Sequence, residues 1–195
     1  MNDNLGFVDL ACDAFAFLVE SYGYSVEVST PTSIVFRSSS VRVVVAFDAR
    51  RSYELDVIAG RITQGLGPEY RLDEILGSLG VPEGGQWRTP QVTTRAALET
   101  FLRKMADLLR EYGGDLLGGS AVAFAEVERY RMGRSQRYAA ERQLRRAKER
   151  AVTAWRSERY AEVVEVLSPV MSMLSKSDAK RLEIARRRVG ESEST

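Results

Sequence analysis

The sequence predicts an α+β fold, with an N-terminal helix packed on a four-stranded antiparallel meander and a mostly helical C-terminal half. Three patterns indicate it. Apolar residues recur at three- and four-residue spacing over 5–22, four short apolar-rich runs follow between 24 and 59, and helical spacing dominates after residue 115. The length of 195 residues is enough for one or two domains.

The first helix is expected over residues 5–22, with Asn4 placed to cap its start and Gly23 suited to the left-handed residue at its end. Four strands should follow, joined by connections that are short and rich in turn-forming residues; their ranges are 24–29, 33–38, 41–47 and 52–59. Short connections favour antiparallel pairing, because a parallel pair needs a long crossover.

Two more helices complete the first region. A short one includes Leu72 and Leu79 and is stopped by Gly80, and a strong one begins after a Thr94 cap and ends at Gly113. The glycines from 113 to 119 match no nucleotide-binding loop, so they predict a helix stop and a flexible join. We therefore expect an α/β domain at 1–114, a helical region at 115–189 and a disordered tail at 190–195.

The helical region should contain three helices. Its first apolar face includes Ala147, Ala151 and Trp155, which fall at helical spacing. Pro169 should kink or restart the next helix, because proline removes a backbone donor. Ser175, followed three residues later by an aspartate, resembles a capping box that opens the last helix.

Composition excludes several classes of protein. The chain is 44% hydrophobic and 28% charged, which is typical of a globular protein, and it contains one cysteine and no histidine. An intramolecular disulfide, a multi-cysteine metal cage and histidine-dependent catalysis are thereby excluded. We expect no enzyme, no cofactor and no metal.

Location and membrane contact also follow from the sequence as expectations. Acidic residues near the start argue against a secretory signal, and no uncharged apolar run approaches the ~18 residues of a spanning helix. A cytoplasmic protein with no membrane partner is therefore expected.

Residues 144–189 resemble a degenerate tetratricopeptide-type helical hairpin, in the order helix, short polar loop, helix, loop, helix. Tyr160 stands where that family has its loop aromatic, and Val163 and Leu167 stand at the small and aromatic positions of its second helix. Ala151 occupies the position where the first helix prefers glycine. The resemblance implies a style of helix packing.

The whole chain also resembles small uncharacterised bacterial proteins with two short motifs. These are Ala-Phe-x-Phe-Leu-Val-x-x-Tyr-Gly-Tyr from Ala14 to Tyr24, and Arg-Ser-x-Glu-Leu-x-Val from Arg51 to Val57. Some proteins of this build serve as immunity or accessory factors beside toxins. The resemblance thus implies a bacterial protein that acts by binding another protein.

Charge is distributed unevenly along the chain. Residues 1–118 hold 11 basic and 16 acidic residues, whereas residues 119–195 hold 17 basic and 11 acidic residues. Such asymmetry is typical of interaction with a charged partner, although attraction between the two halves would also explain it.

The first functional hypothesis is a non-catalytic protein-interaction module, and its sharpest form is an immunity or defence-accessory role. The residues proposed to contact the partner, whose identity the sequence leaves open, are Tyr53, Glu54, Asp56 and Trp87. Glu54 and Asp56 lie two apart on a predicted strand with Asp48 nearby, a set that could hold a divalent ion. The alternation of polar and apolar residues along the strand favours a solvated strand face instead.

The alternative hypothesis is a nucleic-acid-associated protein that uses an arginine stripe on the long helix expected over 120–155. The stripe consists of Arg131, Arg134, Tyr138, Arg142 and Arg145, which step by three or four residues. Glutamates on the same helix instead allow a solvated face with internal salt bridges. A homodimer built on this helix is compatible with both hypotheses.

Overall fold

The computed structural model describes residues 4–63, 66–82 and 87–193. The chain folds into two compact units, Met1–Arg131 and Met132–Thr195. It is an α+β fold with one antiparallel sheet in the first unit and only helices in the described part of the second.

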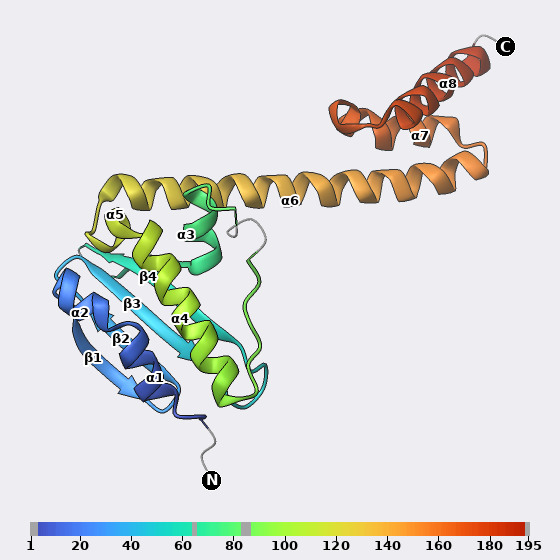
Figure 1. Ribbon diagram of the computed structural model, residues 1–195. Helices are drawn as coiled ribbons and strands as arrows, with labels where there is room; N and C mark the ends of the chain where they lie inside the picture. The colour runs from blue at the N-terminus through green and yellow to red at the C-terminus, as the bar shows by residue number, and fades with distance from the viewer. Residues whose placement is uncertain (1–3, 64–65, 83–86, 194–195) are drawn as a thin grey trace. The chain divides into compact units, whose positions relative to one another are not determined.

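The sheet of the first unit is a meander whose strands pair in chain order (Figure 1). Its strands are β1 Ser25–Thr30, β2 Ser33–Arg37, β3 Val41–Phe47, β4 Leu55–Ile62 and β5 Leu66–Arg71. The antiparallel meander is confirmed, but it has five strands and not the four that we predicted.

The fifth strand lies in a segment that the sequence presented as a glycine-rich connection. β5 pairs Tyr70 with Ala59 and Glu69 with Gly60, and Tyr70 is buried. Gly67 lies close to β4, since a Cβ atom there would be 2.9 Å from the Arg61 carbonyl oxygen. Proline and glycine are tolerated at this edge of the sheet, which explains why local composition concealed the strand.

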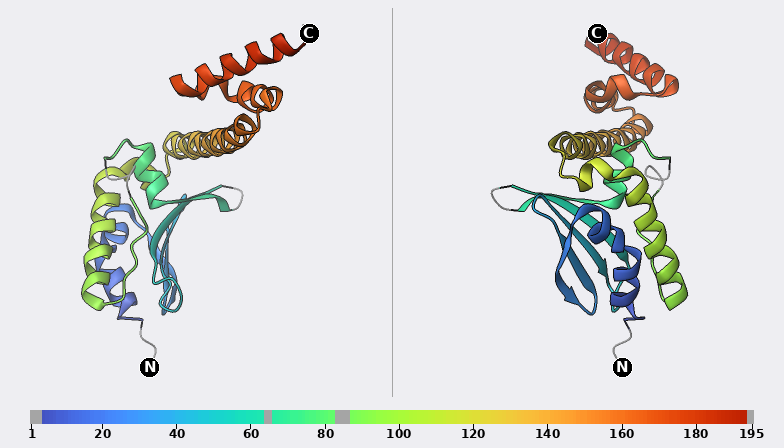
Figure 2. Two further views of the ribbon diagram at one scale, coloured as in Figure 1. Left: turned by 90° about the vertical axis from the view of Figure 1, so that its right-hand side faces the viewer. Right: turned by 60° about the vertical axis from the view of Figure 1, so that its left-hand side comes forward.

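One face of the sheet is covered by helices (Figure 2). They are α1 Phe7–Ala14, α2 Ala16–Tyr22, α3 Leu72–Ser78 and α4 Arg95–Tyr112. The single helix predicted over 5–22 is interrupted at Phe15, whose φ of −99° and ψ of 13° depart from helical values. The Thr94 cap is confirmed, because its side chain accepts a hydrogen bond from the Ala97 amide, and Gly23 adopts the left-handed conformation.

The first unit extends into the long helix as far as Arg131. The helices α5 Gly114–Leu117 and α6 Ala121–Arg156 follow the glycines, and Phe124 and Val127 of α6 join the core of the sheet domain. The glycines break the helix without ending the compact unit, because apolar residues beyond them are still buried in it.

Arg131 fastens α6 to the rest of this unit. Its Nε and Nη2 atoms donate to the two Glu74 carboxylate oxygens at 2.8 and 2.7 Å. The guanidinium carbon also lies 4.2 Å from the centroid of the Tyr70 ring. A charged, two-point hydrogen bond of this kind is among the stronger polar interactions in proteins.

The second unit packs α7 Tyr160–Leu167, the 3₁₀ turn η1 Ser168–Met173 and α8 Lys176–Glu193 against the end of α6. Its buried core is made of small and branched side chains: Ala147, Ala151, Ala154, Val163, Val166, Leu167, Val170, Leu182 and Ala185. Pro169 lies in η1 and interrupts the helix as predicted.

The start of α8 agrees with the prediction, whereas its end differs from it. Ser175 caps the helix as predicted, since its Oγ accepts from the Asp178 amide at 3.2 Å. The helix continues to Glu193, whereas a disordered tail was expected from residue 190. Alternating Arg and Glu at four-residue spacing, including Arg187 and Glu191, supports the added turn.

Within the described ranges, no helix is both long and apolar enough to span a bilayer.

Replacing Arg131 with Ala should lower the free energy of unfolding of the first unit by about 2 kcal/mol, because Glu74 would lose a charged hydrogen-bond partner. Urea unfolding followed by Trp87 fluorescence in a Trp155→Phe background measures it. Arg129→Ala is the matched control, because Arg129 is exposed on the same helix and should change stability by less than about 0.5 kcal/mol. Equal effects of the two variants would contradict the role of Arg131.

The second unit should weaken in acid through Asp178. A hydrogen bond from Lys148 at 2.8 Å, with help from Ser175, lowers the pKa of the Asp178 carboxyl. The stabilisation is therefore complete above the unfolded-state pKa of about 3.9, and it is lost as pH falls through the lower folded-state value. Asp178→Asn should reduce stability more at pH 7 than at pH 3, as Trp155 fluorescence would report. An equal loss at both pH values would contradict this origin.

Candidate functional site

The residues predicted to contact a partner in the first unit do not form one cluster of free side chains. Tyr53 is exposed and has a φ of 55°, and its carbonyl oxygen accepts from the Val92 amide at 2.8 Å. Glu54 is exposed beside an isolated bridge to Gln91. Their role in partner binding stays a prediction.

Asp56 lies on the sheet face opposite the helices and is engaged there. Its Oδ2 atom is 2.7 Å from the Nε of Arg71. Burial raises the pKa of the Asp56 carboxyl above its ordinary value, and the charge of Arg71 opposes that shift. The same face carries two further ion pairs, Arg37–Glu27 and Arg42–Glu69, which flank the buried side chains of Val35 and Val44. These contacts give Asp56 a structural role within the sheet.

Asp48 also serves the fold. Its carboxylate accepts from the backbone amides of Arg50, Arg51 and Ser52 and from the Ser52 hydroxyl, at 3.0 to 3.2 Å. These bonds lower the pKa of Asp48 to about 2. Asp48 thereby shapes the turn before β4, and no group of three metal-ligating side chains occurs among the residues described.

Trp87 is partly buried against the core of the first unit. The Nζ atom of Lys104 lies 5.4 Å from the centroid of its ring. The indole thus packs within its own unit, and only its exposed part is open to a partner.

The predicted arginine stripe is divided by the structure. Arg131 belongs to the first unit, where it binds Glu74. Arg134, Tyr138, Arg142 and Arg145 lie in the second unit and are exposed. Of these, Tyr138 and Arg142 face a groove, whereas Arg145 does not line it.

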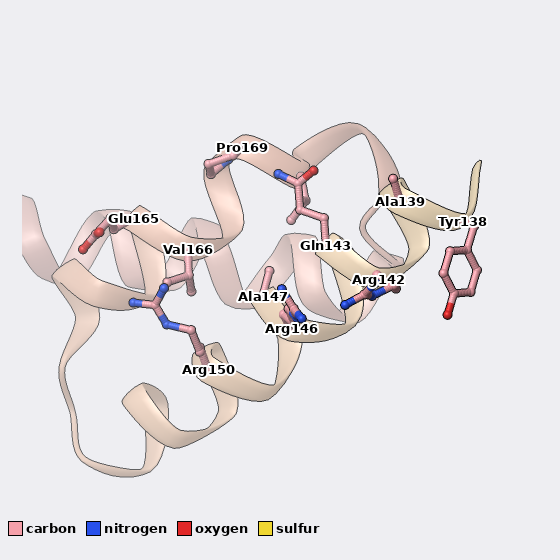
Figure 3. Close-up of a pocket in the computed structure, with 11 residues that line it drawn as sticks. Tyr138, Ala139, Arg142, Gln143, Arg146, Ala147, Arg150, Glu165, Val166 and Pro169 are labelled. Carbon is pink, nitrogen blue, oxygen red and sulfur yellow. The ribbon is translucent and has the colours of Figure 1, made fainter. Parts of the chain in front are cut away.

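This groove, which we call the arginine groove, lies between α6 and the turn that joins α7 to η1 (Figure 3). It has a volume of about 520 Å³. The α6 wall consists of Tyr138, Ala139, Arg142, Gln143, Arg146, Ala147 and Arg150, and the facing wall consists of Glu165, Val166, Pro169 and Val170. Along α6 the lining spans about 18 Å, because twelve residue-to-residue steps from Tyr138 to Arg150 rise by 1.5 Å each.

Three arginines form one row along the groove, Arg142, Arg146 and Arg150, which we call the arginine ladder. The Arg142 guanidinium lies 5.8 Å from the Tyr138 ring centroid, and Arg150 is 3.7 Å from a Glu162 oxygen. Within the ranges that the structure describes, neither Arg142 nor Arg146 has a carboxylate at ion-pair distance. The ladder therefore holds positive charge that its own unit leaves largely unneutralised.

The spacing of the ladder makes this charge unfavourable for the helix. Like charges four residues apart destabilise a helix by about 0.2–0.5 kcal/mol for each pair. Arg145 differs, because Glu141 and Glu149 stand four residues before and after it. The ladder is thus a row of mutual repulsion, whereas Arg145 lies in a row of alternating charge.

Sequence reasoning missed Arg146 and Arg150. A signal was present, because the arginines at 142, 146 and 150 recur every four residues with no glutamate in that row. The facing wall carried no such signal, because its position depends on how α7 packs on α6.

The comparisons with known proteins leave function to be judged from this geometry. No protein-family model, no curated protein and no solved structure matches the chain.

Proposed function

We propose that this chain is a non-catalytic protein-interaction module whose second unit binds an acidic segment of a partner protein in the arginine groove. The observation that carries the proposal is the arginine ladder, whose charge is poorly neutralised within its own unit. An immunity or defence-accessory protein is one class that acts in this way, by occupying the surface of a partner without chemical change.

The groove suits a carboxylate-bearing protein segment in two respects. Guanidinium groups form paired hydrogen bonds with carboxylates, and a row of three offers such bonds along the whole wall. The facing wall supplies Val166, Pro169 and Val170, which give apolar contact of the kind found at the centre of protein interfaces.

Net charge supports the same partner. The second unit, residues 132–195, holds 15 basic and 9 acidic residues, a formal net charge of +6. A field of this sign attracts an acidic protein over distances of about one Debye length, ~8 Å at physiological salt, and mainly speeds association.

Nucleic acid is the second candidate, because the ladder and the exposed ring of Tyr138 also suit a phosphate backbone and a stacked base. The carboxylate of Glu165 and the apolar wall disfavour it, since both lie where phosphates would run. Protein is therefore the better supported partner.

Arg146→Ala should weaken binding of an acidic peptide about tenfold, because one charged hydrogen-bonding group is removed from the centre of the groove. The probe is a fluorescein-labelled 18-residue peptide with four glutamates and four leucines, and the readout is fluorescence anisotropy with the full chain. Arg145→Ala is the matched control, because it removes the same charge from a neighbouring position outside the groove and should change affinity less than twofold.

Two outcomes would contradict the proposal. Equal weakening by Arg146→Ala and Arg145→Ala would mean that general charge, and not the groove, attracts the peptide. Tighter binding of a single-stranded 18-nucleotide DNA, with a steep dependence on salt that Arg146→Ala reduces, would favour the nucleic-acid candidate.

A further inference from the structure

We infer that the segment bound in the arginine groove is an amphipathic helix that lies along α6 and presents a carboxylate every four residues to the ladder. This inference rests on the proposed function and adds the conformation and pattern of the partner. It follows from the spacing of the ladder and the chemistry of the two walls.

The spacing of the ladder fits a helix of acidic residues. Successive arginines are four residues apart on α6, so their Cα atoms advance about 6 Å along the helix axis at each step. A second helix with glutamates at every fourth position advances by the same distance. Each of three carboxylates can then meet one member of Arg142, Arg146 and Arg150.

The two walls require a partner with an acidic face and an apolar face. The arginines stand on one wall, and Val166 and Pro169 stand on the other (Figure 3). A helix meets this requirement, because residues three and four apart share one face, so a row of glutamates can face the ladder while the apolar residues of the next face contact Val166 and Pro169.

Glu165 determines the direction in which the partner helix lies in the groove. Its carboxylate lies at the end of the groove that holds Arg150 and Val166, while Tyr138 lies at the opposite end (Figure 3). A carboxylate there favours a basic residue or the positively polarised first turn of the partner helix. The acidic face is thus expected to run from Arg150 toward Tyr138.

The test compares three 18-residue peptides with one amino-acid composition apart from a single substitution. The in-phase peptide carries four glutamates at every fourth position, with leucines on the adjacent face. The out-of-phase peptide contains the same residues, with the glutamates spread around the helix. The third is the in-phase peptide with a central alanine changed to proline. Anisotropy gives affinity for the full chain, and circular dichroism gives the helicity gained on binding.

The in-phase peptide should bind at least tenfold more tightly than the other two, gain helicity on binding and lose about tenfold in affinity with Arg146→Ala. If all three bind equally and all lose affinity with Arg146→Ala, the helix inference is overturned while the proposed function stands. If no peptide is affected by Arg146→Ala, the proposed function falls and the inference falls with it.

Discussion

The short side chains of Ala147, Ala151 and Ala154 are the constraint from which the second unit is built. They are buried against Val163, Leu167 and Leu182, and their size lets α7 and α8 pack closely on α6. Because this alanine face packs against α7 and α8, helix geometry places the arginine ladder on the neighbouring face of α6, along the arginine groove. A larger residue at these positions would separate the helices and remove the facing wall, at a cost of about 1–3 kcal/mol.

The same packing explains why the ladder is poorly neutralised. The end of α7 and η1 bring mainly apolar residues to the groove, and the one carboxylate on that wall is Glu165 of α7. Asp178 of this unit is used elsewhere, in its pair with Lys148, and Glu162 is shared between Arg159 and Arg150 of the ladder. A row of repelling charges lowers the stability of the free protein, and such local losses are common where a surface is kept ready for a partner.

Much of the fold could be predicted from the sequence, because periodicity and capping are local. The cap at Thr94, the interruption at Pro169 and the cap at Ser175 each depend on residues within a few positions. The failures involve distant partners. β5 was missed because pairing with β4 stabilises a segment with weak strand composition, and the contact of Arg131 with Glu74 joins residues 57 positions apart, which no local pattern reveals. Only one wall of the arginine groove could be predicted from the sequence. The α6 wall follows from helical spacing, whereas the facing wall depends on tertiary packing.

We propose that the arginine ladder is held for a partner and does not stabilise the fold. Arg146→Glu tests this directly, because it replaces two like-charge pairs at four-residue spacing by two pairs of opposite charge, against one new like-charge pair with Glu149 three residues on. The measurement is the free energy of unfolding in urea at low ionic strength, followed by Trp155 fluorescence in a Trp87→Phe background. We expect a rise of about 0.5–1 kcal/mol, whereas a fall of about 1 kcal/mol would mean that the ladder stabilises the fold.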